Sequence, residues 1–277
     1  MEAGWASKHV WRGIDVAQFT SFNHLVPGNP LAEDPDSDIT FVGVNATYKG
    51  FALGLKYIES LDDGFNPFYA PLLTTKDSYS ELILSANYTR MLVGEDWLQG
   101  TFGFDFYYYP NGEFWGVEHQ GMVYANFVMP RYSYAQPFLN LWYNVPTTTD
   151  GQGLANNPAF RGTGGADLVE GWGGELGVMG SRNLYSNDQV GFGLSYSVST
   201  IYKSGYQFES DGFTHVAATL GAPVTIGDSF VVSPSITYVE ALEDVPPTPT
   251  LGPNSGRLAS EWNEPGWYAS LRASWTF

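Results

Sequence analysis

The sequence ends in WYASLRASWTF, residues 267–277, where apolar and polar side chains alternate without a break. Taken by twos from Trp267, one set is Trp, Ala, Leu, Ala, Trp and Phe, and the set between them is Tyr, Ser, Arg, Ser and Thr. Successive side chains of a β-strand point to opposite faces, so this period of two predicts a strand with one apolar and one polar face. A strand of about ten residues is also long enough to cross a lipid bilayer at a tilt.

The same alternation recurs along the whole chain, and no pattern with the period of a helix competes with it. In one example, Val190, Phe192 and Leu194 alternate with glycine and serine. Each such segment predicts a strand, which gives twelve: residues 4–13, 39–48, 51–59, 79–90, 97–109, 116–129, 134–145, 169–181, 189–202, 212–222, 229–241 and 266–277. Because no linker interrupts the series, we expect residues 1–277 to form one domain.

The composition favours a membrane-spanning barrel over a water-soluble domain. Charged residues make up only 15% of the chain and aromatic residues 16%, whereas a typical soluble domain is about a quarter charged. No stretch reaches the roughly 18 consecutive apolar residues of a membrane helix. A closed β-barrel is the other structure that satisfies every backbone hydrogen bond inside lipid. We therefore predict an all-β fold, a transmembrane antiparallel up-and-down β-barrel of about twelve strands.

The last strand resembles the closing strand of bacterial outer-membrane β-barrel proteins. Its terminal Phe277, with Trp275 two positions earlier, is similar to the aromatic end of these proteins, which implies recognition by the barrel-assembly machinery. Residues 7–13, SKHVWRG, also resemble the Ser-x-Tyr-x-x-Arg-Gly opening of a poorly characterised group of proteobacterial outer-membrane barrels, with His9 in place of the aromatic residue. This second resemblance implies a barrel but no established substrate.

The predicted connections alternate between short and long, and in outer-membrane barrels the short ones are periplasmic. The short connections are residues 49–50, 93–96, 130–133, 183–188 and 223–228. The longest of the others are residues 14–38, 60–78, 146–168 and 242–265. We therefore expect a bacterial outer-membrane protein with both termini in the periplasm, surrounded by outer-membrane lipid and lipopolysaccharide.

Charged side chains on the strands predict which face lines the interior. A Lys or Arg that faces lipid at mid-depth costs roughly 2–4 kcal/mol, so the face that carries charge is placed inward and Trp5 and Trp11 face the membrane. Seven charges are assigned to the lumen in this way: Lys8, Arg12, Lys56, Glu81, Asp105, Glu175 and Arg272. The basic ones fall on strands that are neighbours around the barrel, and the acidic ones fall elsewhere. The expected result is a transverse electric field across an open lumen, or else salt bridges that plug it.

Other chemistries find less support in the sequence. A net charge of -17 with only 12 Lys and Arg argues against a nucleic-acid partner. The absence of cysteine excludes a thiolate metal site or nucleophile. Asp34, Asp36 and Asp38 are candidate Ca²⁺ or Mg²⁺ ligands, although the full calcium-loop pattern is absent. Ser7 and His9 share a predicted face, as in a lipid esterase, but no third catalytic group is identifiable. We expect no cofactor and no enzymatic activity.

Twelve strands lie between the eight of a side-chain-filled barrel and the sixteen of a water-filled porin. The sequence therefore predicts a narrow channel for passive diffusion of small hydrophilic solutes or ions. Inward Tyr107, Tyr109 and Tyr124 either fill space or offer a stacking track for sugars or nucleosides. The alternative is a non-conducting barrel with a structural, adhesive or partner-binding role. The solute, the oligomeric state and any inward-folded loop stay open at this stage.

Overall fold

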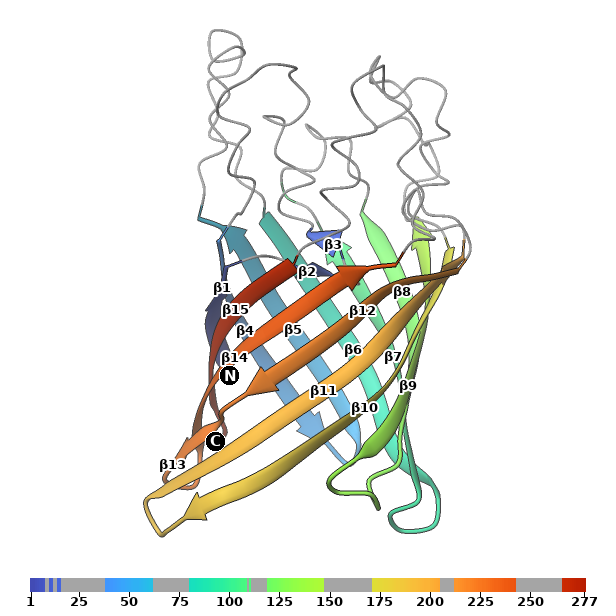
Figure 1. The fold of residues 1–277 in the computed structure, drawn as a ribbon. Helices are drawn as coiled ribbons and strands as arrows, with labels where there is room; N and C mark the ends of the chain where they lie inside the picture. The colour runs from blue at the N-terminus through green and yellow to red at the C-terminus, as the bar shows by residue number, and fades with distance from the viewer. Residues whose placement is uncertain are drawn as a thin grey trace, which may run out of the picture.

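The computed structural model describes residues 1–7, 10–11, 14–15, 38–61, 80–108, 110, 119–146, 171–204, 212–242 and 266–277. These residues form one sheet of thirteen strands and a separate two-stranded sheet (Figure 1). The large sheet contains β1 (Glu2–Ala6), β4 (Ile39–Tyr48), β5 (Phe51–Ser60), β6 (Ser80–Val93), β7 (Leu98–Tyr108), β8 (Gln120–Val128), β9 (Gln136–Pro146), β10 (Gly171–Ser186), β11 (Val190–Ser204), β12 (Gly212–Gly221), β13 (Val224–Ile226), β14 (Phe230–Ala241) and β15 (Gly266–Trp275). The small sheet contains β2 (Val10–Trp11) and β3 (Ile14–Asp15).

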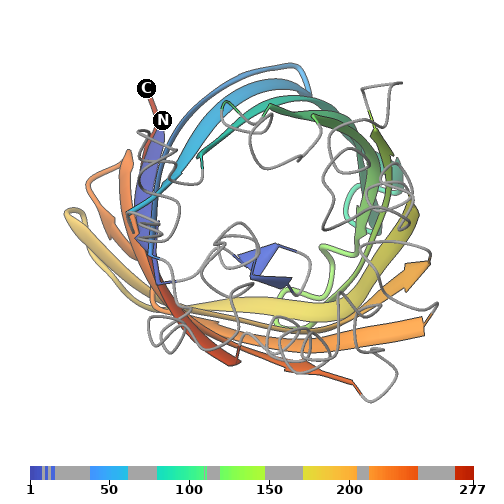
Figure 2. The same ribbon diagram turned by 90° about the horizontal axis from the view of Figure 1, so that it is seen from above.

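The large sheet closes on itself to form an antiparallel barrel (Figure 2). Closure comes from β10, which pairs with β9 on one side and with β11 on the other. The strand β1 lies between β4 and β15, so the two ends of the chain meet in the wall. The short β13 pairs with β11 and β14, the same neighbours as β12, and continues β12 beyond Ala222 and Pro223. With β12 and β13 counted as one, the barrel has the twelve strands that the alternation predicts.

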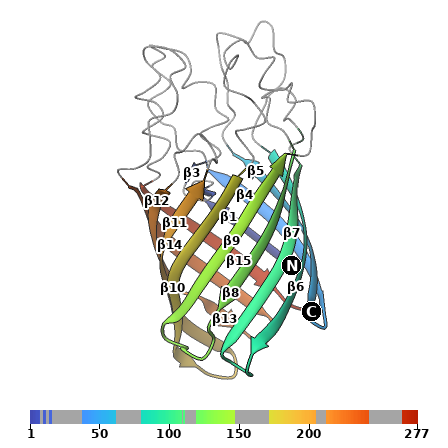
Figure 3. The ribbon, with the colours of Figure 1, turned by 90° about the vertical axis from the view of Figure 1, so that its right-hand side faces the viewer.

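The two ends of the barrel differ. At one end, named here the short-turn end, connections of two to seven residues join β4 to β5, β6 to β7, β8 to β9, β10 to β11 and β13 to β14 (Figure 3). Lys49 and Gly50 have φ values of 48° and 88°, as the type I′ turn of a two-residue hairpin requires. The Asn187 side chain accepts hydrogen bonds from the backbone N–H groups of Gln189 and Val190, at 2.9 and 2.7 Å. At the opposite end, the long-loop end, the strands lead into segments outside the described residues.

The first predicted strand, residues 4–13, is wrong beyond its start. β1 ends at Ala6, Ser7 adds one more backbone hydrogen bond to β15, and β2 pairs with β3 in a sheet of its own. The physical reason is that β4 begins at Ile39, the partner of Ala6, so a longer β1 would have a neighbour on one side only. Figures 1 and 2 place the β2–β3 hairpin inside the ring of strands, at the level of the long-loop end. The expectation that Trp11 lies on a lipid-facing wall strand is therefore wrong.

Two predicted turns are shorter than expected. The expected turn at residues 183–188 contains the end of β10, which stays paired with β11 to Ser186 through a register shift between Asn183 and Tyr185. The expected turn at residues 223–228 contains β13. In both places, residues that favour turns lie next to a long neighbouring strand. The backbone hydrogen bonds to that strand therefore continue past the positions where a turn is expected.

One face of the wall carries large apolar side chains that are exposed on the outside of the barrel, including Val44, Leu53, Leu176, Val198 and Leu271. Aromatic pairs form a band on this face near each end of the strands. Toward the long-loop end, the ring centroids of Tyr143 and Trp172 lie 4.7 Å apart and those of Tyr238 and Trp267 4.9 Å apart. Toward the short-turn end, the pairs are Phe51–Tyr88, at 4.5 Å, and Phe230–Trp275, at 6.4 Å. An apolar belt between two aromatic bands suits a lipid bilayer with its two interfaces.

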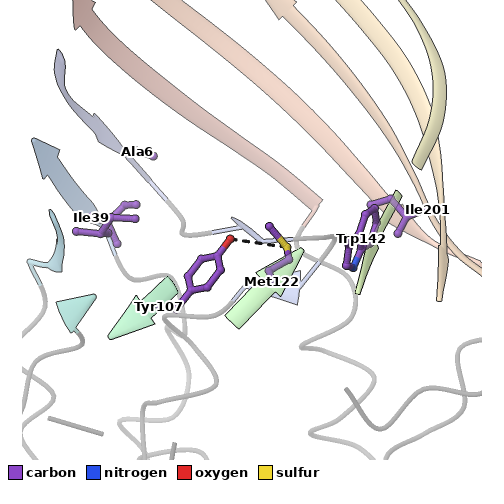
Figure 4. Close-up of a cluster of buried hydrophobic side chains, with 7 residues drawn as sticks. Ala6, Ile39, Tyr107, Met122, Trp142 and Ile201 are labelled. Carbon is purple, nitrogen blue, oxygen red and sulfur yellow. Dashed lines mark hydrogen bonds between the residues drawn. The ribbon is translucent and has the colours of Figure 1, made fainter. Parts of the chain in front are cut away.

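The buried apolar side chains lie on the other, interior face. They form a core of Ala6, Ile39, Ile58, Tyr107, Met122, Trp142 and Ile201 (Figure 4). All seven belong to the parts of their strands nearest the long-loop end, where the hydroxyl of Tyr107 contacts the sulfur of Met122 at 3.9 Å. Among the described residues, no helix has the length and apolar character to cross a membrane. The dense packing of the interior is therefore concentrated at one end of the barrel.

Candidate functional site

The interior face of β11, β12, β14 and β15 is lined with small hydroxyl side chains, and we name it the hydroxyl wall. Directly paired residues share a face of a sheet, and Ser197, Thr219, Thr237 and Tyr268 are paired in that order across the four strands. Thr219 and Thr237 hydrogen-bond to each other at 2.9 Å. The members of this wall are Ser195, Ser197, Ser199, Thr219, Ser233, Ser235, Thr237, Tyr268, Ser270 and Ser274. The wall offers uncharged hydrogen-bonding groups over much of the barrel's height, and Arg272, the direct partner of Ser233, adds a charge on the same face of β15.

The opposite part of the interior, from β4 to β10, carries larger side chains, several of them aromatic. Four of these rings lie against a glycine that is the direct partner on the neighbouring strand. Tyr124 covers Gly103, and Trp142 covers Gly173, so closely that a Cβ on either glycine would overlap the ring. Two further pairs follow the same rule, Phe41 with Gly4 and Phe138 with Gly177. The glycines let the rings lie along the wall instead of projecting toward the barrel axis.

Of the four basic side chains predicted for one wall, Lys56 and Arg272 lie among the described residues, and both have acidic neighbours. Arg272 forms an ion pair with Glu2, which is close to it in the register of β1 and β15. The ammonium of Lys56 lies 4.3 Å from the centroid of the Phe41 ring. Lys56 also interacts electrostatically with Glu2, Arg272 and Glu81. These contacts partly compensate the positive charge of Arg272 and Lys56, and the transverse field across the lumen stays a prediction beside its salt-bridge alternative.

Glu175 occupies the interior face of β10, at the middle of its pairing with β9. The side-chain amide of Asn140 on β9 donates a hydrogen bond to Oε2 at 2.9 Å. The hydroxyl of Ser199 on β11 donates a hydrogen bond to Oε1 at 2.6 Å. One donor from each neighbouring strand thus fixes the two carboxylate oxygens, and both donors are uncharged.

Several further polar side chains are buried at the long-loop end of the interior. Glu81 and Lys203 are 3% and 0% exposed, and both have interactions with other groups. Asp105 lies on the same face of β7 as Tyr107 and is paired with Ser85 and Met122. His215 is fully buried, with its Nδ1 2.9 Å from the hydroxyl of Thr214. Charge at this end is packed into the wall together with the apolar core.

Other predicted site residues lie outside the described residues or form structural contacts. Lys8, Arg12, His9, Tyr109, Asp34 and Asp36 are outside them. Asp38 accepts a hydrogen bond from the indole of Trp5 at 3.1 Å. Within the described segments, no three His, Cys, Asp or Glu side chains group as a metal site would require.

The remaining predicted residues lie close to the strand β15. The Ser7 hydroxyl accepts a hydrogen bond from the backbone N–H of Ala269 at 3.0 Å and so extends the pairing of β1 with β15. Trp275 and Phe277, the predicted assembly signal, stack with centroids 5.5 Å apart. Phe277 is 91% exposed. Its ring is therefore accessible on the outside of the barrel.

Sequence reasoning missed Glu2, Lys203 and His215. Glu2 lies two residues before the start of the predicted first strand, and Lys203 one residue after the end of another. Extending the period of two from Lys8 back to residue 2, or from Ser199 on to residue 203, would have placed both on the interior face. His215 follows the same rule, because the period of two from Thr219 through Ala217 places it on the interior face, before the register shift between Ile201 and Tyr202.

No family model matches this sequence, and no curated protein matches it. Solved structures of bacterial outer-membrane barrels do match the fold. The NanC porin aligns over 100% of this chain and 99% of its own, with a TM-score of 0.51 and 10% identity. The KdgM porin gives a TM-score of 0.48 at 6% identity and LpxR from Salmonella typhimurium 0.44 at 10%, each over 100% of this chain and 99% of its own. At these identities the likeness shows the barrel fold alone.

Proposed function

We propose that this protein is a channel of a bacterial outer membrane through which small hydrophilic solutes or ions pass by passive diffusion. The observation that supports it is the hydroxyl wall, which runs along one side of the interior and contains uncharged groups. Thr219–Thr237 and Ser235–Ser270 hydrogen bonds, at 2.9 and 2.7 Å, hold parts of this wall in place. Such groups replace hydration water without binding a solute tightly, which a conducting path requires.

The aromatic–glycine pairs on the other wall support the same function. Side chains as large as Trp142 and Tyr124 would fill the centre of a small barrel if they pointed at its axis. Their positions against Gly173 and Gly103 keep ring volume close to the backbone. A solute path along the hydroxyl wall is compatible with this arrangement.

For orientation, we propose that the short-turn end faces the periplasm, with the long loops outside. The outer face would then contact phospholipid at one interface and lipopolysaccharide at the other. β15 ends at the short-turn end with Trp275, and Met1 donates a hydrogen bond from its amino group to the carbonyl of Trp275 at 2.8 Å. The exposed Phe277 would be available to the barrel-assembly machinery from the periplasm.

Planar-bilayer recording of the purified full chain tests the channel. We expect discrete conductance steps that become smaller in Ser197→Trp, because the new indole occupies space beside the hydroxyl wall. Val198→Trp is the matched control, since Val198 is the next residue on β11 and faces outward, and its conductance should equal that of the wild type. Inserted protein that carries no current, or equal conductance in Ser197→Trp and the wild type, would contradict the proposal.

A second candidate is a non-conducting surface barrel. The observation that favours it is the packing at the long-loop end, where the β2–β3 hairpin lies within the ring of strands and the apolar core is concentrated. If this packing seals the lumen, the segments at that end would carry the function by binding a partner. The conductance measurement separates the two, because a sealed barrel inserts without a current.

A further inference from the structure

Glu175 has no neighbouring interior side chains on its own strand, β10. The interior positions before and after it on β10 are Gly173 and Gly177. Trp142 and Phe138 cover these glycines from β9. Glu175 is therefore the one acidic group in a short aromatic and glycine-rich segment, and Asn140 and Ser199 fix its direction.

Two other interior carboxylates act on basic side chains, whereas Glu175 is bound by neutral donors, although the buried Lys203 lies on the same face of β11, diagonally across from it. Glu2 is paired with Arg272, and Glu81 acts on Lys56. The hydrogen-bond donors to Glu175 are an amide and a hydroxyl, and within the part of the chain that the structure describes it has no ion pair. A carboxylate oriented by neutral donors keeps its negative charge available to a mobile cation.

Oxygen atoms surround the approach to this carboxylate. Tyr268 on β15 hydrogen-bonds to Thr237 and interacts electrostatically with Glu175, although three strand positions of the wall lie between β15 and β10. Across the wall, Tyr268 is paired in register with Thr237, Thr219 and Ser197, and Ser199 on the last of these strands donates to Glu175, so hydroxyl oxygens line the wall between the two residues. Hydroxyl and carboxylate oxygens are the ligands that hard cations accept in place of water.

The chain's overall charge acts in the same direction. A net charge of -17 raises the local concentration of cations at the protein and lowers that of anions. On the basis of the proposed channel function, we infer that Glu175 is a binding site for small monovalent cations in the lumen and gives the channel a preference for cations over anions. The ligand class includes alkali ions and small ammonium compounds, which share a single positive charge and bind to oxygen.

Reversal potentials across a planar bilayer with a potassium chloride gradient test the preference. The wild type should prefer potassium to chloride, and Glu175→Gln should lower the permeability ratio roughly threefold, as expected for loss of one charge within several ångströms of the path. Glutamine has the shape of glutamate and retains hydrogen-bonding groups, so the fold should persist. Glu59→Gln is the matched control, because Glu59 lies on the outward face of β5, and its ratio should stay at the wild-type value. A wild-type ratio that favours chloride, or an equal ratio in Glu175→Gln, would overturn the inference.

Crystals grown in rubidium chloride test the site without a current. An anomalous difference peak beside the Glu175 carboxylate in the wild type, absent in Glu175→Gln, is the expected result. No peak in the wild type would overturn the inference even if the protein conducts. A barrel that carries no current but shows the peak would contradict the channel and leave the cation site supported.

Discussion

The indole of Trp142 lies across Gly173, its direct partner on β10, so closely that a Cβ at Gly173 would overlap the ring. Phe138 and Gly177 repeat the relationship four residues further along the same pair of strands, with a ring carbon 2.7 Å from the Cβ position. Two of the interior glycines of β10 therefore decide where the largest interior rings of β9 can lie. Packing on the wall and space in the lumen are linked through these pairs.

Gly173→Ala should lower the free energy of unfolding of the barrel and narrow its lumen. The added methyl group displaces Trp142, and overpacking of this kind costs about 1–3 kcal/mol. The free energy of unfolding can be measured in lipid vesicles by urea titration with tryptophan fluorescence, and the conductance should fall in the same variant. Gly191→Ala is the control, because the nearest atom to its Cβ position is 3.5 Å away. Equal unfolding midpoints for the two variants would show that the ring does not depend on the glycine.

Val198→Arg and Ser197→Arg should differ in stability although they are adjacent on β11. Val198 is 56% exposed on the outward face, where an arginine near the bilayer midplane costs roughly 2–4 kcal/mol. Ser197 faces the interior, where the guanidinium keeps access to water. Unfolding in vesicles should therefore occur at a lower urea concentration for Val198→Arg only. Similar losses in both variants would mean that the outward face of β11 is not in lipid.

The face on which each strand side chain lies could be predicted, because side chains alternate with an exact period of two in a strand with one apolar face. On β15, the alternation of Leu271 and Arg272 places the two on opposite faces, and a shift by one residue would expose every apolar side chain of the strand to the lumen. The cost of that shift grows with strand length, so long strands such as β11 have well-determined faces. Because of this constraint, the number of strands and the barrel class could be predicted from the sequence.

Contacts between strands could not be predicted in the same way, because alternation gives a face but no height along the barrel. The ion pair of Glu2 with Arg272 depends on the register of β1 against β15, which joins the two ends of the chain. The end of β1 at Ala6 depends on where β4 begins. Neither relationship has a local sequence signal, and both decide which charges in the lumen are compensated.

Phe277→Ala should reduce assembly in cells without lowering the stability of the folded barrel. Phe277 is 91% exposed and contacts the ring of Trp275. Truncating it therefore changes the buried surface area of the folded barrel very little. We expect severalfold less protein in the outer membrane of a Gram-negative host, and an unchanged thermal midpoint for protein refolded from urea into detergent. Tyr48→Ala, which removes another exposed ring at the short-turn end, should leave the cellular level unchanged. A lower thermal midpoint for Phe277→Ala would indicate a structural role instead.

Removal of the β2–β3 hairpin should enlarge the conducting path. The hairpin lies inside the ring of strands at the long-loop end, and Ala6 and Ile39 are direct partners on β1 and β4, so a short Gly-Ser linker can replace residues 8–37 without straining the wall. Replacing residues 62–79 by the same linker is the control, because it joins β5 to β6 beside the paired Glu59 and Ser80. Single-channel conductance should rise in the first variant more than in the second. Equal conductance in both would show that the hairpin does not limit the path, and the constriction would then lie among the buried side chains near Trp142.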